Sequence, residues 1–369
     1  MLDAFFKPNA VAVIGASRSP EKLGYSVLAN IVESGFAGGI YPINPGTDVI
    51  LGFRAYASVA ELPEIPELAV IVIPYQHVPA AVEECGEAGI KAVVVISAGF
   101  REVGLEGLER ELELKDIARK HNLRLIGPNC LGVIDTKTPL NATFAAGTPH
   151  SGPIAFMSQS GALGTAILDM SLAGKRLGLG KFVSLGNKAD VAEADLLEYL
   201  ADDEETRVIL AYSEGLPEGR HFMKVARAVT RQKPVIIVKS GVTQSGQKAV
   251  SSHTGSLAGA EQAYQSAFFQ TGVLRAETME ELFDYALAFA YQPLLEGNRI
   301  AIVTNAGGPG ILATDALEKA GMELARLDDE TKRELEAFLP GAASAANPVD
   351  VLGDARSDRY EFALKKVAE

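Results

Sequence analysis

Val11-Ala12-Val13-Ile14-Gly15-Ala16-Ser17 is an apolar run, rich in β-branched residues, that ends in a tight glycine turn. Gly24 lies directly before an amphipathic stretch, for which we predict a helix over residues 25–33. A strand that passes through such a turn into a helix places backbone N–H groups at the carboxyl end of the strand, where they can bind phosphate. This segment therefore predicts the first strand of an α/β domain with a phosphate-type loop beside it.

Short apolar runs alternate with amphipathic stretches along most of the chain. Such alternation predicts parallel strands joined by helices, in a doubly wound sheet whose strands are buried on both faces. In the first part of the chain we predict strands at residues 11–14, 39–43, 68–73, 92–96 and 124–126. Gly, Pro and Thr then cluster at residues 145–153, so we place the end of a first α/β domain (1–147) here.

A second α/β domain is expected over residues 148–292, followed by a linker and a third unit over residues 298–369. The predicted strands of the second domain are residues 154–157, 181–184, 208–212 and 235–239. The third unit shows only two short strand patterns, at residues 300–304 and 323–327. Two strands do not bury a normal sheet core, so we expect this domain to be incomplete, as part of a longer natural polypeptide, rather than docked on another chain.

Composition limits the classes of partner. The 369 residues carry a formal net charge of −13, which disfavours nucleic acid and anionic membranes because no basic surplus can neutralise phosphates. No run approaches 18 apolar residues, so no membrane span is expected. Cys85 and Cys130 lie far apart without metal-ligand spacing. They fit a reducing cytoplasm, and we predict a cytoplasmic protein without a metal site of its own.

The first loop does not match a dinucleotide-binding fingerprint. The pattern G-x-G-x-x-G is absent, and the second strand runs into Asn44-Pro45 rather than ending in the acid that binds a ribose hydroxyl. An NAD-dependent dehydrogenase is therefore disfavoured. Ser17, Arg18 and Lys22 in the loop suit a more highly phosphorylated nucleotide.

Further loops follow the other strands of the first domain. In open α/β sheets, ligands bind outside the carboxyl ends of the strands, so we expect these loops to meet at one crevice. The loops contain Asn44 and Pro45, Pro74, Ser97 and Gly99, and Asn129. For the last of them, Gly127-Pro128-Asn129-Cys130-Leu131-Gly132, a purely structural rigid turn is the alternative.

A second anion site is predicted at Ser158-Gln159-Ser160-Gly161-Ala162, where a strand passes through a polar turn into a helix. Ser158 or Ser160 could cap the helix, while the Gly161 and Ala162 amides favour an anion. The segment superficially resembles a nucleophile elbow, but the G-x-S-x-G pattern is missing. We prefer phosphate binding to a serine nucleophile.

Ser252-His253-Thr254-Gly255 places one of only five histidines among small hydroxyl-bearing residues, after the last strand of the second domain. A histidine in such a loop can accept a group on a ring nitrogen and pass it on. Glu214 ends a strand of the same sheet, and a carboxylate bonded to one imidazole nitrogen leaves the other as a nucleophile. The alternatives are a turn histidine with local hydrogen bonds and a solvated loop acid.

Together these motifs resemble the α subunit, or α-like half, of nucleoside-diphosphate-forming (ADP-forming) acyl-CoA synthetases, a branch of the succinyl-CoA synthetase superfamily. The segments 13–17, 127–132, 158–161 and 252–255 occur in the order and spacing of that family, and the similarity covers essentially the whole chain. The resemblance implies a Rossmann-like CoA-binding domain followed by flavodoxin-like domains, the second domain of the chain bearing a phosphorylatable histidine.

The resemblance also implies roles for single residues. His253 would be the phosphohistidine and Glu214 its supporting carboxylate. Phosphate and the acyl group would be bound by Ser158, Ser160, Gly161, Ala162 and Thr165. Coenzyme A would contact Gly15, Ser17, Arg18, Lys22, Asn44, Pro45, Pro74, Ser97, Gly99 and Asn129. Many relatives have lysine where this chain has Gly46, so a CoA-phosphate contact must come from elsewhere, for example from Lys22.

The expected enzyme is an acid–thiol ligase that interconverts acyl-CoA, phosphate and ADP with acid, CoA and ATP. By resemblance, ADP or ATP with Mg²⁺ binds to an ATP-grasp partner, either a separate β subunit or a fused β-like domain, so a hetero-oligomer is expected. The alternative is a CoA-binding or regulatory module without chemistry. The presence of both Glu214 and His253 argues against that alternative, since a sensor needs no phosphate acceptor.

Overall fold

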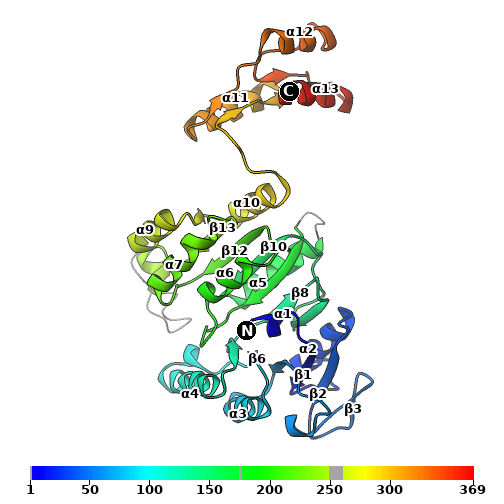
Figure 1. The fold of residues 1–369 in the computed structure, drawn as a ribbon, viewed down its shortest axis with the longest axis vertical. Coiled ribbons are helices and arrows are strands. Elements are labelled where there is room, and N and C mark those ends of the chain that lie inside the picture. The colour runs from blue at the N-terminus through cyan, green and yellow to red at the C-terminus, as the bar shows by residue number, and fades with distance from the viewer. Residues whose placement is uncertain (1, 174–176, 249–260) are drawn as a thin grey trace. The chain divides into compact units, whose positions relative to one another are not determined.

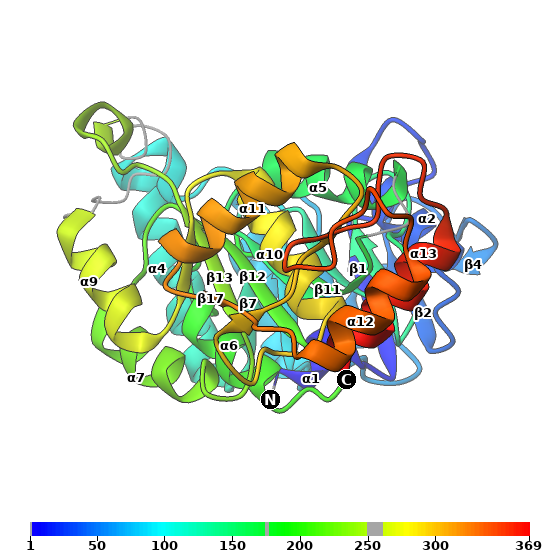
Figure 2. The same cartoon turned by 90° about the horizontal axis from the view of Figure 1, so that it is seen from above.

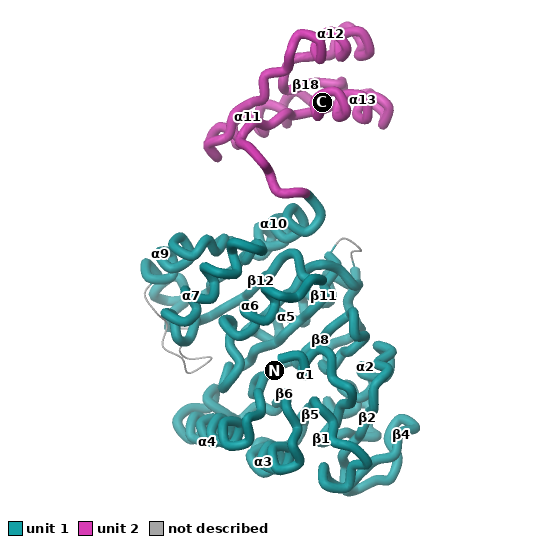
Figure 3. The backbone as a smooth tube through the Cα atoms, viewed as in Figure 1, with its two compact units in different colours: residues 1–292 teal, residues 293–369 magenta. Residues whose placement is uncertain are grey.

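The computed structural model describes residues 2–173, 177–248 and 261–369. It consists of two units, Met1–Gln292 and Pro293–Glu369 (Figure 3). The segment that contains His253 lies outside the described residues. Among the residues that are described, none of the helices combines the length and apolarity that crossing a bilayer requires.

The first unit opens with a parallel five-stranded sheet of order β2-β1-β5-β6-β7 (Figure 1). Its strands are β1 (Ala10–Ile14), β2 (Gly39–Ile43), β5 (Leu68–Ile71), β6 (Ala92–Val95) and β7 (Arg124–Ile126). Its helices are α1 (Asp3–Phe6), α2 (Leu23–Glu33), α3 (Val78–Ala88) and α4 (Leu105–His121). Residues of α1 and α2 pack on one face of the sheet and residues of α3 and α4 on the other. The central strands β1, β5 and β6 are therefore apolar, and every residue of each is buried.

A second sheet in the same unit has seven strands, in the order β14-β13-β12-β10-β11-β8-β9. Its strands are β8 (Gly132–Asp135), β9 (Leu140–Thr143), β10 (Ile154–Ser158), β11 (Leu179–Ser184), β12 (Val208–Ser213), β13 (Val235–Lys239) and β14 (Leu274–Ala276). Its helices are α5 (Gly161–Ala173), α6 (Glu193–Ala201), α7 (Gly219–Val229), α9 (Glu261–Thr271) and α10 (Met279–Tyr291). The helices α5 and α10 pack on one face, and α6, α7 and α9 on the other (Figure 2). The α/β fold class with parallel sheets is confirmed.

The β8–β9 hairpin differs from the all-parallel sheet that the sequence predicts. It follows the first sheet along the chain but joins the second, where β8 runs antiparallel to β11. The Asp135 carboxylate accepts hydrogen bonds from the N–H groups of Lys137 and Thr138 and so shapes the turn. Asn30 of α2 donates through Nδ2 to the carbonyls of Thr143 and Ala145, at 2.8 and 2.7 Å. The hairpin thereby fastens the two sheets together and fixes the space between them.

A buried ion cluster ties this hairpin to the second sheet. Lys181 of β11 lies 2.9 Å from the Asp203 carboxylate and 3.4 Å from that of Asp135, and only 2% of its side chain is exposed. Thr206 donates its hydroxyl to Asp203 at 2.6 Å. Burial alone would raise the pKa of Asp203, but the bonds from Thr206 and Lys181 outweigh it and hold the pKa below its usual value.

The second unit contains two pairs of very short parallel strands. The pairs are β15 (Arg299–Ile300) with β17 (Glu323–Leu324), and β16 (Val303–Thr304) with β18 (Val349–Asp350). The helices are α11 (Gly307–Lys319), α12 (Asp329–Phe338) and α13 (Ser357–Ala368). Two differences from the sequence prediction appear: residues 300–304 belong to two strands, and β18 forms where no strand was predicted. The buried core of this unit is small: Leu335, Leu339, Val349, Val351 and Ala363.

Candidate functional site

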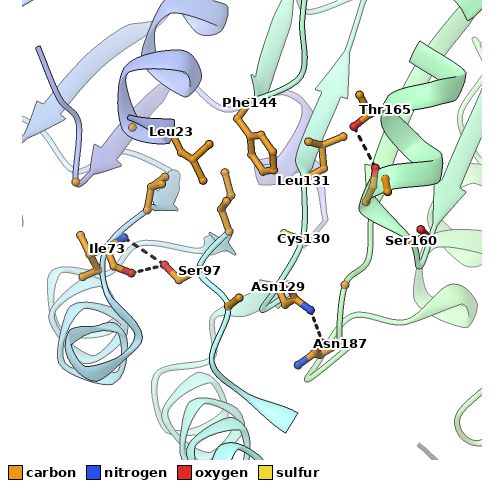
Figure 4. A pocket seen from close by; sticks show the side chains of 18 of the residues that line it. Leu23, Ile73, Ser97, Asn129, Cys130, Leu131, Phe144, Ser160, Thr165 and Asn187 are labelled. Atoms are coloured by element: carbon orange, nitrogen blue, oxygen red, sulfur yellow. Dashed lines mark hydrogen bonds between the residues drawn. The ribbon is translucent and has the colours of Figure 1, made fainter. Parts of the chain in front are cut away.

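A cavity of about 910 Å³ lies between the two sheets of the first unit (Figure 4). Loops at the carboxyl ends of β1, β5 and β6 supply one side, and the start of α5 and the end of β12 supply the other. Ten of the residues singled out in the sequence line it: Gly15, Lys22, Pro74, Ser97, Asn129, Ser160, Gly161, Ala162, Thr165 and Glu214. The strand-end loops thus meet at one crevice.

The remaining singled-out residues do not line this cavity. Ser17 is buried, and its hydroxyl accepts the N–H of Ser19 at 3.1 Å. Ser158 is buried and donates its hydroxyl to the Ser160 carbonyl at 2.7 Å. Asn44 donates to the carbonyl of Ala16 at 2.7 Å. The side chains of Ser17, Asn44 and Ser158 therefore bond to backbone groups of the loops and do not face the cavity. Arg18 and Pro45 are exposed, Gly99 is half-buried, and His253 lies outside the described residues.

The first loop has no room for side chains at two glycines. Gly15 has φ +92°, and a Cβ there would lie 2.3 Å from the Val72 carbonyl oxygen. A Cβ on Gly24, near the start of α2, would lie 2.0 Å from the Gly15 carbonyl oxygen. The end of β1 and the start of α2 therefore touch through backbone alone, which leaves N–H groups close to any ligand in the cavity.

Ser97 joins the loops after β5 and β6. Its hydroxyl donates to the Ile73 carbonyl at 2.6 Å and accepts the Ile73 N–H at 3.2 Å, as the dashed lines of Figure 4 show. Across the cavity, the amide groups of Asn129 and Asn187 point toward one another, with Nδ2 of Asn129 3.4 Å from Oδ1 of Asn187. The floor of the cavity is therefore built from both sheets.

The start of α5 forms the opposite wall. The Ser160 hydroxyl accepts the N–H of Leu163 at 3.3 Å, which is the bond of a helix N-cap. A Cβ on Gly161 would meet its nearest neighbour only at 3.9 Å, so the backbone here is accessible. An N-terminal helix end that faces a cavity attracts negative charge.

Glu214 follows β12 and is 8% exposed. Its backbone N–H donates to Oε1 of Gln159 at 2.8 Å. Gln159 lies at the carboxyl end of β10, in the register where β10 pairs with β12. The two strand ends therefore hold the backbone of Glu214 at the cavity wall.

Cys130 also lines the cavity, but its chemistry is that of a neutral thiol. Burial raises its pKa to about 12, and the thiol donates to the Val95 carbonyl at 3.3 Å. A thiolate would be needed for nucleophilic attack. Cysteine catalysis is therefore disfavoured here at neutral pH.

Several lining residues were missed in the sequence. Asn187 donates to the carboxylates of Glu102 and Glu111 at 2.7 and 2.8 Å, and Arg101 donates to its carbonyl. Burial raises the pKa of Glu111. Phe144 and Leu131 give the cavity an apolar side. Gln159 directly follows β10 and Asn187 lies three residues after β11, so strand-end position could have identified them, whereas nothing in the sequence marks Phe144.

Three family models match the chain: a CoA binding domain at residues 9–136, a succinyl-CoA ligase like flavodoxin domain at residues 151–289, and a Ligase-CoA domain at residues 300–368. The acetate–CoA ligase [ADP-forming] II subunit alpha of Pyrococcus furiosus is 49% identical, over 98% of this chain and 78% of its own length. The acetate–CoA ligase [ADP-forming] I of Archaeoglobus fulgidus is also 49% identical, over 100% of this chain but only 53% of its own length.

A solved structure is similar to this chain as well. A dinucleotide forming acetyl-coenzyme A synthetase 1 from Ca. Korarchaeum cryptofilum, in complex with phosphate and ADP, is 41% identical with a TM-score of 0.95. The similarity covers 99% of this chain and 79% of that one. This chain therefore spans about four fifths of some relatives and about half of others, in which further sequence is fused.

Proposed function

Because the chain belongs to the family of ADP-forming acyl-CoA ligases, we propose that it is the α part of an enzyme that interconverts acyl-CoA, phosphate and ADP with acid, CoA and ATP. The observation that carries this proposal is that three features line the same cavity: the phosphate-type loop after β1, the N-terminus of α5 and the buried Glu214. A thioester, a phosphate and a phosphoryl acceptor must all meet in such an enzyme.

Coenzyme A would bind along the first sheet. The Gly15 turn and the start of α2 offer backbone N–H groups, and exposed Lys22 offers a cation at the rim. Ser97 and Asn129 line the cavity further in, toward Ser160. The thioester would lie there, and the acyl group would extend toward Ala162 and Thr165, whose small side chains admit acyl groups of different sizes.

The chemistry would proceed in two transfers on this chain. A phosphate oxygen attacks the thioester carbonyl carbon, the C–S bond breaks, and CoA leaves as the thiol after taking a proton. A ring nitrogen of His253 then attacks the phosphorus of the bound acyl phosphate, and the acid leaves as carboxylate. The start of α5 would stabilise the charge on the phosphoryl group, because phosphoryl transfer depends on positioning and electrostatics. Glu214 would orient the imidazole.

The phosphoryl group would finally pass to ADP on an ATP-grasp partner. Some relatives are named as α subunits, while others are longer chains that this one covers by half. Both forms support a partner that is either separate or fused, and hence a hetero-oligomer in the first case. Two buried free thiols, Cys85 and Cys130, support a reducing cytoplasm as the compartment.

Substitution of Gly24 by alanine should weaken CoA binding at least about tenfold, which corresponds to about 1.4 kcal/mol. The new Cβ would lie 2.0 Å from a backbone oxygen of Gly15, so the loop itself must move. Titration calorimetry with CoA measures the effect. Gly219→Ala is the matched control, because a Cβ there meets nothing within 4 Å. If the two variants bind CoA with equal affinity, CoA does not bind at the β1 loop.

The proposed function is tested by incubating the protein with radiolabelled phosphate and a panel of acyl-CoAs, with and without an ATP-grasp partner chain. Acid-labile, base-stable label on the protein is expected with the acyl-CoA that is its substrate, and that acyl-CoA identifies the acyl group. If CoA binds but no acyl-CoA gives label even with the partner, the chain is a CoA-binding module without chemistry.

A further inference from the structure

Lys188 lies in the loop between β11 and α6, in a backbone conformation that lysine rarely adopts. Its φ is +59°, in the left-handed region where glycine or asparagine is less strained. Its side chain is nevertheless only 5% exposed. Strained residues persist where the surrounding structure requires them. The contacts of the buried Lys188 side chain should therefore show why lysine occupies this position.

Each of the three donors of the ammonium group has an acceptor. Nζ donates to Oε1 of Gln159 at 2.9 Å, to Oε1 of Glu193 at 2.9 Å and to the carbonyl of Gly215. The Glu193 side chain is 1% exposed, so the ion pair is shielded from water. An ammonium has three N–H groups, and all three are used inside the protein. Lys188 therefore has no donor left for a ligand.

These acceptors surround Glu214 on both sides. Gln159 uses the same Oε1 to accept the N–H of Glu214 at 2.8 Å, and Gly215 is the next residue along the chain. The hydroxyl of Ser213, the residue before Glu214, lies 2.8 Å from Oε1 of Glu193 and 3.1 Å from the Gly215 carbonyl. The backbone that carries Glu214 is thus fastened to one buried ammonium group.

We propose that Lys188 is a positioning residue of the phosphoryl-transfer site, which aims the Glu214 carboxylate at the phosphate acceptor. The inference rests on the proposed function, because it assumes that Glu214 takes part in the reaction. Lys188 does not contact the reacting atoms. It acts through Gln159 and Gly215, whose positions it sets.

The test variant is Lys188→Asn, because asparagine tolerates the left-handed backbone and its short, uncharged side chain lacks the ammonium group that bonds Gln159 and Gly215. We expect kcat and the rate of phosphoenzyme formation to fall by about 100-fold, the usual cost of a misplaced catalytic group. The KM for acyl-CoA should stay within about twofold, because the CoA loops lie on the other sheet. The assay uses the protein with its ATP-grasp partner.

The matched control is Lys181→Met, which also removes a buried, ion-paired lysine near the same strand but has no bond to the Glu214 loop. It should keep its kcat per folded molecule. If Lys188→Asn folds poorly, the double variant Lys188→Asn/Glu193→Gln removes both buried charges. We expect it to recover stability and to remain as slow as the single variant. A double variant with wild-type kcat would overturn the proposal.

Glu214→Gln separates this inference from the proposed function. If Lys188 acts through Glu214, Lys188→Asn should add less than about threefold to the loss in a Glu214→Gln background, because coupled residues are not additive. A full 100-fold addition would show that Lys188 acts elsewhere and would refute the inference alone. Wild-type turnover of Glu214→Gln itself would instead refute the role given to Glu214 in the proposed function.

Discussion

Replacing His253 with alanine should abolish net turnover of acyl-CoA to ATP and leave CoA affinity nearly unchanged. The imidazole is the proposed phosphoryl acceptor, and without it the acyl phosphate has no route to ADP. Loss of a nucleophile of this kind costs about four orders of magnitude or more in kcat. The CoA-lining loops belong to the first sheet and precede His253 by more than a hundred residues. Binding and transfer are therefore separable.

Two measurements on the same preparation check this result. Overall turnover and protein-bound label should both vanish in His253→Ala, while calorimetry with CoA gives the wild-type affinity. His150→Ala is the control, since His150 is an exposed histidine in the loop between β9 and β10 and has no proposed role. Label that survives in His253→Ala would assign the phosphoryl group to another residue. An equal loss of CoA binding would contradict the separation of roles.

The architecture of the first unit could be predicted because its strands are buried on both faces. The apolar runs predicted at residues 11–14 and 92–96 coincide closely with β1 and β6, which are fully buried. Because ligands bind at the carboxyl ends of parallel strands, we could also predict that loops distant in the sequence meet at one crevice. Ten of the singled-out residues line one cavity for this reason.

Which side chain of a loop enters the cavity could not be predicted. Ser17 and Ser97 both follow strands, yet Ser17 turns inward to cap Ser19 while Ser97 lines the cavity. The β8–β9 hairpin was missed because no helix follows it to mark a strand–helix unit, and its partner β11 lies about fifty residues later in the sequence (Val133 pairs with Val183). Lys188 was missed because its importance comes from three acceptors on separate segments, which only the folded chain brings together.

Replacing Lys181 with methionine should cost about 3–5 kcal/mol of unfolding free energy at neutral pH, since it leaves the buried carboxylates of Asp135 and Asp203 without their cation. That is a large part of the roughly 5–15 kcal/mol that stabilises a typical protein. The chain has no Trp, so urea unfolding is followed by circular dichroism. Lys137→Met is the control: Lys137 pairs with Glu205 at the surface, and its loss should change stability far less.

The pH dependence of the Lys181→Met variant gives the sharper test. In the wild type the pKa of Asp203 is lowered, because the bonds from Thr206 and Lys181 outweigh burial. A lowered acid pKa stabilises the fold above the unfolded value of about 3.9 and loses that contribution as the pH falls through the folded value. Without Lys181, burial should raise the pKa, and protonation then relieves the unpaired charge. The stability difference between wild type and variant should therefore be largest near neutral pH, and it should shrink as the pH falls through the raised pKa of the variant and then through the lowered pKa of the wild type. A difference that stays constant with pH would mean that lost packing, and not the buried charge, causes the destabilisation.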